Sequence, residues 1–264
     1  MDPMTFSTYM TSPGARKIRS PIFIMSFNRP DYLSQVLKSL VEQVSADINN
    51  RKVVLFQDGA VNLVSHKRRA RDEDILACID VFRTAFPDGE IQASSVNLGV
   101  ALNFDRAEQY GYEVLNSDAV IFLEDDLILG PNYISILDTL IERFHNDARV
   151  GYIAAYGDHT KRLKDQLANL RRLIPLTHNW GFALYRRQWL RMQPRIAEYL
   201  NTISDADYAE KDDKQIHQLF RIWGFGCPAI SQDAAKTLAC CIDGAVKINT
   251  LVCNARYIGE HGLT

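Results

Sequence analysis

Three adjacent carboxylates, Glu124, Asp125 and Asp126, follow four apolar residues in the segment VIFLEDDLILG. The apolar run predicts a buried strand, whose carboxyl end would deliver the acids to the edge of a sheet. Three carboxylates side by side repel one another and lose hydration, and a divalent cation with oxygen ligands, Mg²⁺ or Mn²⁺, would remove that cost. Such an ion could bridge to phosphate oxygens. The competing interpretation is a solvated acidic turn that caps the following helix.

Polar residues follow two other predicted strands. Asp58 and Gly59 end the segment KVVLFQDG, and Asn97 and Gly99 lie in NLGVALNFDRA, which continues with helical spacing. Taken alone, the first pair is typical of a turn and the second of a helix start. Each pattern by itself therefore indicates a binding site only weakly.

Apolar runs and helical periodicity alternate through the first half of the chain. We expect strands at residues 21–27, 52–59, 90–96 and 119–126, with helices between them that include residues 33–44, 66–85 and 99–115. This order predicts an α/β fold with a mostly parallel, Rossmann-like central sheet flanked by helices. Open sheets of this kind bind ligands at the carboxyl ends of their strands, where the three acids are expected.

The second half of the chain is less regular. We expect helices at 132–145, 186–200 and 208–223, strands at 150–157 and 180–185, and an apolar segment at 247–252. Residues 158–178 are basic and polar, which predicts a mobile surface loop or a short helix. No Pro/Ser-rich linker or internal repeat divides the halves.

Bulk properties exclude several classes of function. The 264 residues include 30 basic and 32 acidic ones, so no overall field favours nucleic acid or an anionic membrane. The five cysteines form no CxxC pair, which favours free thiols in a reducing compartment. No apolar run is long enough to span a membrane and residues 1–19 lack the apolar core of a signal peptide. We therefore expect a soluble, cytoplasmic protein with a flexible leader.

The acidic triplet resembles the DXD motif of GT-A glycosyltransferases. The longer segment VIFLEDDLILGPNY is similar to the EDD segment of the N-acetylglucosaminyltransferase I family and of its bacterial sugar-transferase relatives. SFNRPDYL, FQDG and NLGVALNFDRA resemble further segments of these proteins, in the same order along the chain. The resemblance implies a single GT-A domain at residues 20–264, with a nucleotide-sugar-binding half (20–130) and an acceptor-binding half (131–264).

The resemblance also implies roles for individual residues on the donor side. Arg29 would lie near the nucleotide or its phosphates, Asp58 would hydrogen-bond the base, and Asn97 and Gly99 would lie beside the nucleotide. NWGFALYRRQW resembles an acceptor-side segment, in which Trp180 either stacks on a sugar ring or belongs to the core.

The metal is expected to be held chiefly by Asp126. Asp125 would lie near the ribose or the metal shell, and Glu124 toward the sugar or a neighbouring base. His261, in the segment GEHGLT, matches a region that carries a histidine in several relatives. It could ligate the metal or contact the diphosphate, although a histidine near a terminus is more often solvated.

An inverting transfer needs a base for the acceptor hydroxyl. Counted back from NARYIGEHG, the family's base motif falls on Asp233, without the tryptophans that flank it in the family. Asp212 and Asp213 are the alternative, because EKDDKQIH looks superficially like the same motif. Ser231 and Asp233 also read as capping residues of a helix.

The sequence thus predicts a metal-dependent glycosyltransferase, inverting if Asp233 is the base, that uses Mn²⁺ or Mg²⁺. It would move a sugar, for example N-acetylglucosamine, from a UDP-sugar to a hydroxyl of a glycan or glycoconjugate. Membrane contact is expected only through a lipid-linked acceptor. One alternative is a nucleotidyltransferase, although Ser26–Pro30 offers no Gly-rich loop for a triphosphate. The other is a non-catalytic sugar-binding protein.

Overall fold

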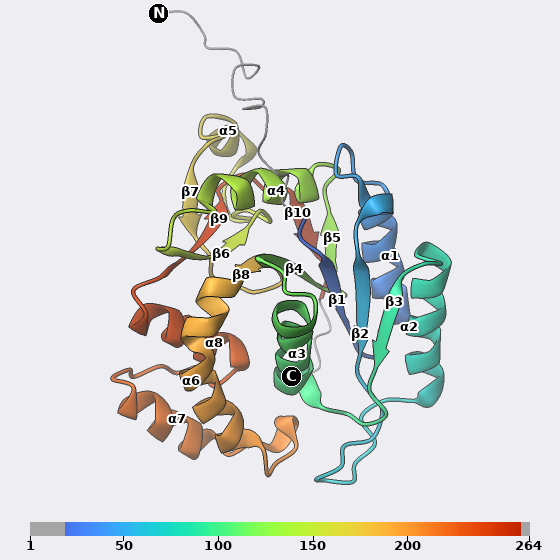
Figure 1. Ribbon diagram of the computed structural model, residues 1–264, viewed down its shortest axis with the longest axis vertical. Coiled ribbons are helices and arrows are strands. Elements are labelled where there is room, and N and C mark those ends of the chain that lie inside the picture. The colour runs from blue at the N-terminus through green and yellow to red at the C-terminus, as the bar shows by residue number, and fades with distance from the viewer. Residues whose placement is uncertain (1–18, 260–264) are drawn as a thin grey trace, which may run out of the picture.

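The computed structural model describes residues 19–259, which form one eight-stranded sheet flanked by helices (Figure 1). The strand order is β3-β2-β1-β4-β8-β6-β9-β7. The strands are β1 (Ile22–Ser26), β2 (Val53–Gln57), β3 (Glu90–Ala93), β4 (Ala119–Glu124), β6 (Val150–Ala154), β7 (Leu173–Pro175), β8 (Gly181–Tyr185) and β9 (Val246–Thr250).

The strand directions confirm the predicted α/β fold class. β3, β2, β1 and β4 pair in parallel, β8 is antiparallel to both β4 and β6, β9 is parallel to β6, and β7 is antiparallel to β9. All the strands except β7 and β8 therefore run in the same direction. The carboxyl ends of β2, β1 and β4 meet at one edge, and the residues that follow them are brought together there.

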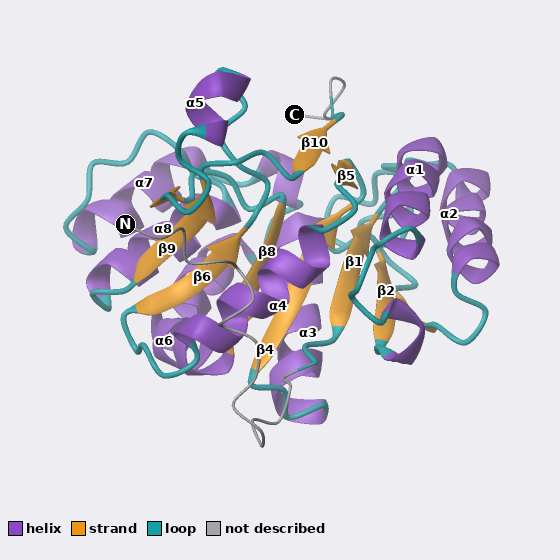
Figure 2. Ribbon diagram, turned by 90° about the horizontal axis from the view of Figure 1, so that it is seen from above, coloured by secondary structure: helices purple, strands orange, loops and turns teal. Residues whose placement is uncertain are grey.

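Helices cover both faces of this sheet (Figures 1 and 2). In Figure 1, α4 lies above the middle strands, whereas α3 and α6 lie below them. α1 packs against α2, and α6 packs against α8. The helices are α1 (Pro30–Val41), α2 (Asp72–Ala85), α3 (Gly99–Gln109), α4 (Tyr133–Phe144), α5 (Leu163–Leu167), α6 (Arg186–Ile203), α7 (Asp213–Ile222) and α8 (Gln232–Ile242).

Aromatic packing fixes the position of β4. Residues 119–123 are at most 1% exposed, as their apolar sequence predicts. The ring centroid of Phe122 lies 5.6 Å from that of Phe23 on β1 and 5.3 Å from that of Phe182 on β8. Burying each phenylalanine contributes about 1.5–3 kcal/mol, so the strand that carries the acids is held on both sides.

Several predicted boundaries differ from the structure. The strand expected at 90–96 ends at Ala93, and the helix expected at 208–223 begins at Asp213. The strand expected at 119–126 ends at Glu124, and Asp125 and Asp126 lie in a turn. The helix expected at 66–85 begins only at Asp72. The preceding residues form a loop, in which His66 has a φ of 55° and Val61 pairs with Arg68.

A second, small sheet lies next to the acidic turn. β5 (Leu127–Leu129) pairs antiparallel with β10 (Ala255–Tyr257), with Leu127 opposite Tyr257. This pairing brings the end of the described chain against the carboxylates. Within residues 19–259, no helix combines the length and the apolar character that crossing a bilayer requires.

Candidate functional site

The acidic turn is buried at the carboxyl edge of the sheet. Asp125 and Asp126 are each 3% exposed, and Glu124 is partly exposed. The next element is β5, so these acids do not cap a helix. Their burial also excludes the interpretation as a solvated turn, because charged groups taken out of water need a partner.

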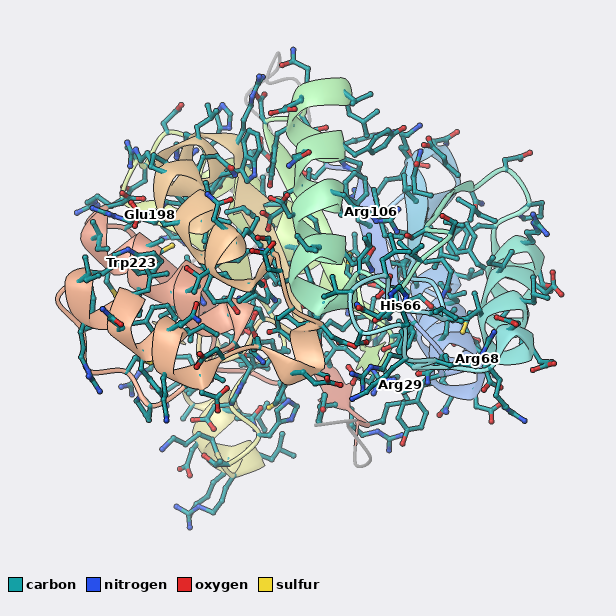
Figure 3. The ribbon with its side chains drawn as sticks, turned by 90° about the horizontal axis from the view of Figure 1, so that it is seen from below. Arg29, His66, Arg68, Arg106, Glu198 and Trp223 are labelled. Atoms are coloured by element: carbon teal, nitrogen blue, oxygen red, sulfur yellow. The ribbon has the colours of Figure 1, made fainter. Side chains whose placement is uncertain are left out.

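Arg29 is that partner in this structure. It lies in the loop after β1 and is labelled in Figure 3. Its Nη2 donates to Asp125 and lies 3.0 Å from Oδ2 of Asp126. Burial raises the pKa of Asp125 to about 6, although the guanidinium lowers it. Burial likewise raises the pKa of Asp126. One arginine therefore compensates two carboxylates whose ionised forms burial disfavours.

The remaining oxygens fit a divalent cation. Oδ1 of Asp126 is buried and has no hydrogen-bond partner among the described residues. Within residues 19–259, no side chain donates a hydrogen bond to the Glu124 carboxylate. Its pKa is held well above the usual value by burial first, and then by Asp233 and Asp126. Residues 19–259 hold no ready group of three His, Cys, Asp or Glu ligands, but Mg²⁺ commonly binds one or two carboxylates and completes its shell with phosphate and water.

Asp233 is brought to the same site from the far end of the sequence. Ser231 caps α8, and Asp233 lies in the first turn of that helix, where its Oδ1 accepts from Asn179 Nδ2 at 3.0 Å and from Gln232 Nε2 at 2.7 Å. Trp180 follows Asn179 in the chain, and its backbone carbonyl accepts a hydrogen bond from the Glu124 backbone N–H at 2.9 Å. Asn179 and Trp180 thus connect Asp233 to the acidic turn.

Trp180 is stacked on both of its faces. Its ring lies 4.2 Å from that of Tyr257 and 4.5 Å from that of His178, with interplanar angles of 12° and 5°. Two rings so close and so parallel to one indole would collide on a shared face, so they cover opposite faces. In this arrangement a sugar would meet Tyr257 or His178 before it met the indole face.

Asp58, Asn97 and Gly99 form a closed network after β2. Asp58 Oδ1 accepts from the N–H groups of Gly59 and Leu98, and its Oδ2 accepts from Asn97 Nδ2 and the Gly99 N–H, all at 2.8–3.0 Å. The Asp58 side chain therefore holds the start of α3 to the end of β2. Binding a base would require one of these bonds to be exchanged, and the predicted role of Asp58 stays a prediction.

Two features of the structure favour glycine at position 99. Its φ is +73°, a conformation that favours glycine, and an added Cβ would lie 2.6 Å from Cβ of Tyr208. The start of α3 therefore packs directly on the segment that precedes α7.

The other two candidate bases lie elsewhere. Asp212 caps α7 and accepts from the N–H groups of Lys214 and Gln215, and Asp213 is the exposed first residue of that helix. Neither contacts the acidic turn. His261 lies outside the described residues.

The chain beyond β10 covers the acids. The Ile258 N–H donates to the Asp126 carbonyl at 2.9 Å, and a Cβ on Gly259 would lie 2.6 Å from Asp126 Oδ2. Two surface grooves, of about 340 and 300 Å³, lie elsewhere, beside residues 128–132 and beside α7. Neither groove is lined by the carboxylates.

Sequence reasoning missed three residues of the site, Asn179, His178 and Tyr257. Asn179 and His178 precede the predicted Trp180, and Tyr257 lies in the segment RYIGEHG used to locate the base. All three residues therefore lie in segments that the sequence had already marked as part of the site. Nothing local in the sequence, however, shows that Tyr257 stacks on Trp180.

Comparisons with known proteins find similarity in structure only. No protein-family model matches the chain, and no curated protein matches it in sequence. The chain is similar to S. aureus TarS, with a TM-score of 0.45 and 13% identity over 66% of this chain and 29% of that one. It is also similar to glucosyl-3-phosphoglycerate synthase from Mycobacterium tuberculosis in complex with Mn²⁺, UDP and phosphoglyceric acid, with a TM-score of 0.40 and 14% identity over 66% and 58% of the two chains.

A second complex of that synthase, with glucosyl-3-phosphoglycerate, UDP and Mn²⁺, gives a TM-score of 0.43 and 14% identity over 92% of this chain and 73% of the other. The chain thus spans less than two thirds of the length of TarS and of the first synthase structure. At these scores and identities the likenesses add nothing about activity. The narrower resemblance to the N-acetylglucosaminyltransferase I family stays a prediction.

Proposed function

We propose that this chain is a metal-dependent glycosyltransferase that moves a sugar from a UDP-sugar to a hydroxyl group of a glycan or glycoconjugate. The observation that carries the proposal is the buried Glu124-Asp125-Asp126 turn at the carboxyl edge of the sheet, beside Arg29 and coupled to Asp233. A cluster with one arginine for several carboxylates suits a divalent ion, whose two positive charges offset the excess of carboxylates and which can also bind a diphosphate.

On the donor side, Mn²⁺ or Mg²⁺ would be held chiefly by Asp126, whose Oδ1 has no other partner among the described residues. When bound, the ion neutralises the negative charge that develops on the departing UDP. Arg29 would give up part of its contact with the carboxylates and would contact the diphosphate instead. Asp58, Asn97 and Gly99 follow the neighbouring strands and would flank the nucleoside.

On the acceptor side, Asp233 would take the proton of the attacking hydroxyl, which would make the transfer inverting. The two donors on its Oδ1, Asn179 and Gln232, orient the carboxylate and leave Oδ2 available. Tyr257 and His178, stacked on Trp180, would supply the apolar ring faces on which a sugar packs. We place the reaction in the cytoplasm with a hexosyl or N-acetylhexosaminyl donor.

A screen for slow donor hydrolysis tests this proposal without knowledge of the acceptor. The purified chain is incubated with Mn²⁺ and a panel of nucleotide sugars, and release of the nucleoside diphosphate is measured. We expect at least one UDP-sugar to be hydrolysed, and Asp126→Asn to lower that rate by about 10²-fold or more.

Asp80→Asn is the matched control, because Asp80 is 75% exposed on α2 and remote from the acidic turn. It should hydrolyse the same donor at the unchanged rate. Hydrolysis of no nucleotide sugar, or equal rates for Asp126→Asn and Asp80→Asn, would refute the proposed function.

A further inference from the structure

Residues 158–172 form a loop that projects from the sheet, which we call the α5 loop. Its two ends meet at one residue, since the Asp158 N–H donates to the Leu251 carbonyl at 3.2 Å and the Leu251 N–H donates to the Arg172 carbonyl at 2.9 Å. α5 lies at its tip, away from the body of the molecule (Figures 1 and 2). The loop is therefore a closed appendage of the Ω type.

One buried amide, within α5 itself, ties the α5 loop to the chain that precedes β10. Gln166 is 8% exposed, its Nε2 donates to the Lys161 carbonyl at 2.8 Å, and its Oε1 accepts from the Cys253 N–H at 2.9 Å. Asn169 adds a bond to the Asp165 carbonyl at 2.8 Å. These bonds hold the backbone of the α5 loop in one conformation. They therefore also set the direction in which the other side chains of the loop point.

Three leucines point outward from this fixed backbone. Leu163, Leu167 and Leu170 are 70%, 58% and 61% exposed. Leu163 and Leu167, four residues apart, lie on one side of α5, and Leu170 lies in the turn that follows the helix. Leucine is among the residues most often buried in folded proteins, and a group of exposed leucines on a projecting loop suits a surface that meets an apolar partner.

Basic side chains surround these leucines. Lys161, Arg162, Lys164, Arg171 and Arg172 are exposed, and the only acids of the α5 loop are Asp158 and Asp165. Five positive and two negative charges leave a local charge of +3, in a chain whose net charge is −2. Arg162 is paired with Asp165 at 3.0 Å, so the positive charge on which the proposal rests is that of Lys161, Lys164 and Arg172.

We propose that the α5 loop docks this protein on an anionic lipid bilayer, with its three leucines in the interface and its basic side chains among the lipid phosphates. Apolar tips flanked by lysine and arginine have this effect, because burial and attraction to anionic headgroups act together. A protein partner fits less well, because a stable protein interface needs about 800 Å² on each side and a narrow projection offers little flat area.

The direction of docking would turn the candidate site toward the bilayer. Figure 2 shows α5 and β10 at the same edge of the molecule, and β10 carries Tyr257 of the site. The ring centroid of His159, in the α5 loop, lies 6.4 Å from that of Trp180. The docking does not depend on the proposed function, and it can be measured without any substrate.

Vesicle co-sedimentation of the full chain tests the proposal. We expect binding to vesicles of phosphatidylcholine mixed with phosphatidylglycerol, weaker binding to phosphatidylcholine alone, and weakening by added salt. The variant Leu163→Asn/Leu167→Asn/Leu170→Asn should lower the partition coefficient by about tenfold or more. The variant Lys161→Gln/Lys164→Gln/Arg172→Gln should lose the preference for anionic vesicles.

The matched control is Leu76→Asn/Val114→Asn/Leu190→Asn, which alters three apolar residues of comparable exposure, 59%, 67% and 53%, on other elements. It should bind vesicles like the unchanged chain, and thermal melting checks that every variant folds. No binding to anionic vesicles, or equal binding by the two triple-asparagine variants, would overturn the proposal. So would self-association in solution that only the α5-loop leucines support, because the surface would then be a protein interface.

Discussion

Asp233 carries the most specific assignment at the level of single residues. The side chain receives hydrogen bonds from Asn179 and Gln232 and is among the charges that raise the pKa of Glu124. Asp212, by contrast, is occupied with the backbone of α7 at the surface. The candidates that the sequence left open thus lie in two different places, and the choice of Asp233 as the base stays a prediction.

Replacing each candidate base should separate them in activity. Asp233→Asn keeps an oxygen that can accept from Asn179 but removes the proton acceptor, so we expect kcat to fall by about 10²–10⁴-fold with little change in the KM of the donor. Asp212→Asn and Asp213→Asn should retain full kcat. Steady-state hydrolysis of the donor identified by the screen measures all three, and a large loss in Asp212→Asn or Asp213→Asn alone would contradict the assignment.

The acidic turn could be predicted because its signal is local. An apolar run followed at once by Glu124, Asp125 and Asp126 indicates both a buried strand and the edge at which it ends. The partners of these acids could not be predicted in the same way. Nothing near Trp180 in the sequence indicates that Tyr257 covers one of its faces, because that contact depends on how the two sheets pack.

Among the elements, α3 and α8 are joined by a buried ion pair. Lys236 Nζ donates to Glu108 Oε1 at 2.6 Å, and the side chains of the two residues are 4% and 1% exposed. Burial raises the pKa of Glu108, while Lys236 lowers it. Since α8 also carries Asp233, this pair fixes the helix that presents the candidate base.

Removing one partner of this pair should be costly. Lys236→Met leaves Glu108 buried without its cation, so the free energy of unfolding should fall by about 3–5 kcal/mol at neutral pH. The folded-state pKa of Glu108 is raised, and protonation therefore stabilises the folded state as pH falls. The loss caused by Lys236→Met should accordingly shrink in acid.

Urea denaturation measures this effect, and the double variant Lys236→Met/Glu108→Leu should recover most of the loss. Lys52→Met is the control, since the exposed pair of Lys52 with Glu90 should contribute about 1 kcal/mol or less. Additive losses in the double variant would show that the two side chains do not stabilise one another.

Long elements with clear periodicity were predicted within a few residues, as α4 and α6 show. The early start expected for α2 failed for a tertiary reason. Arg69, within the expected helix, pairs instead with Asp207 from the chain before α7. The short strands β5 and β10 have three residues each, too few for a periodic signal, and only their mutual pairing defines them.

At the scale of the whole molecule, total charge is a poor guide to surfaces. A net charge of −2 predicts no attraction to anionic membranes, yet the α5 loop alone carries +3. Charges of opposite sign act separately when they lie further apart than about 8–10 Å, the screening length at physiological salt. A local surface must therefore be assessed in the folded structure, in which its neighbours are known.

The central claim is that the acidic turn binds a nucleoside diphosphate together with a divalent ion. Calorimetric titration with UDP, in the presence and absence of Mn²⁺, tests it most directly. We expect UDP to bind the unchanged chain and Asp80→Asn only when Mn²⁺ is present, and Asp126→Asn to lose this metal-dependent binding. Equal binding with and without Mn²⁺, or no binding of UDP under either condition, would contradict the account.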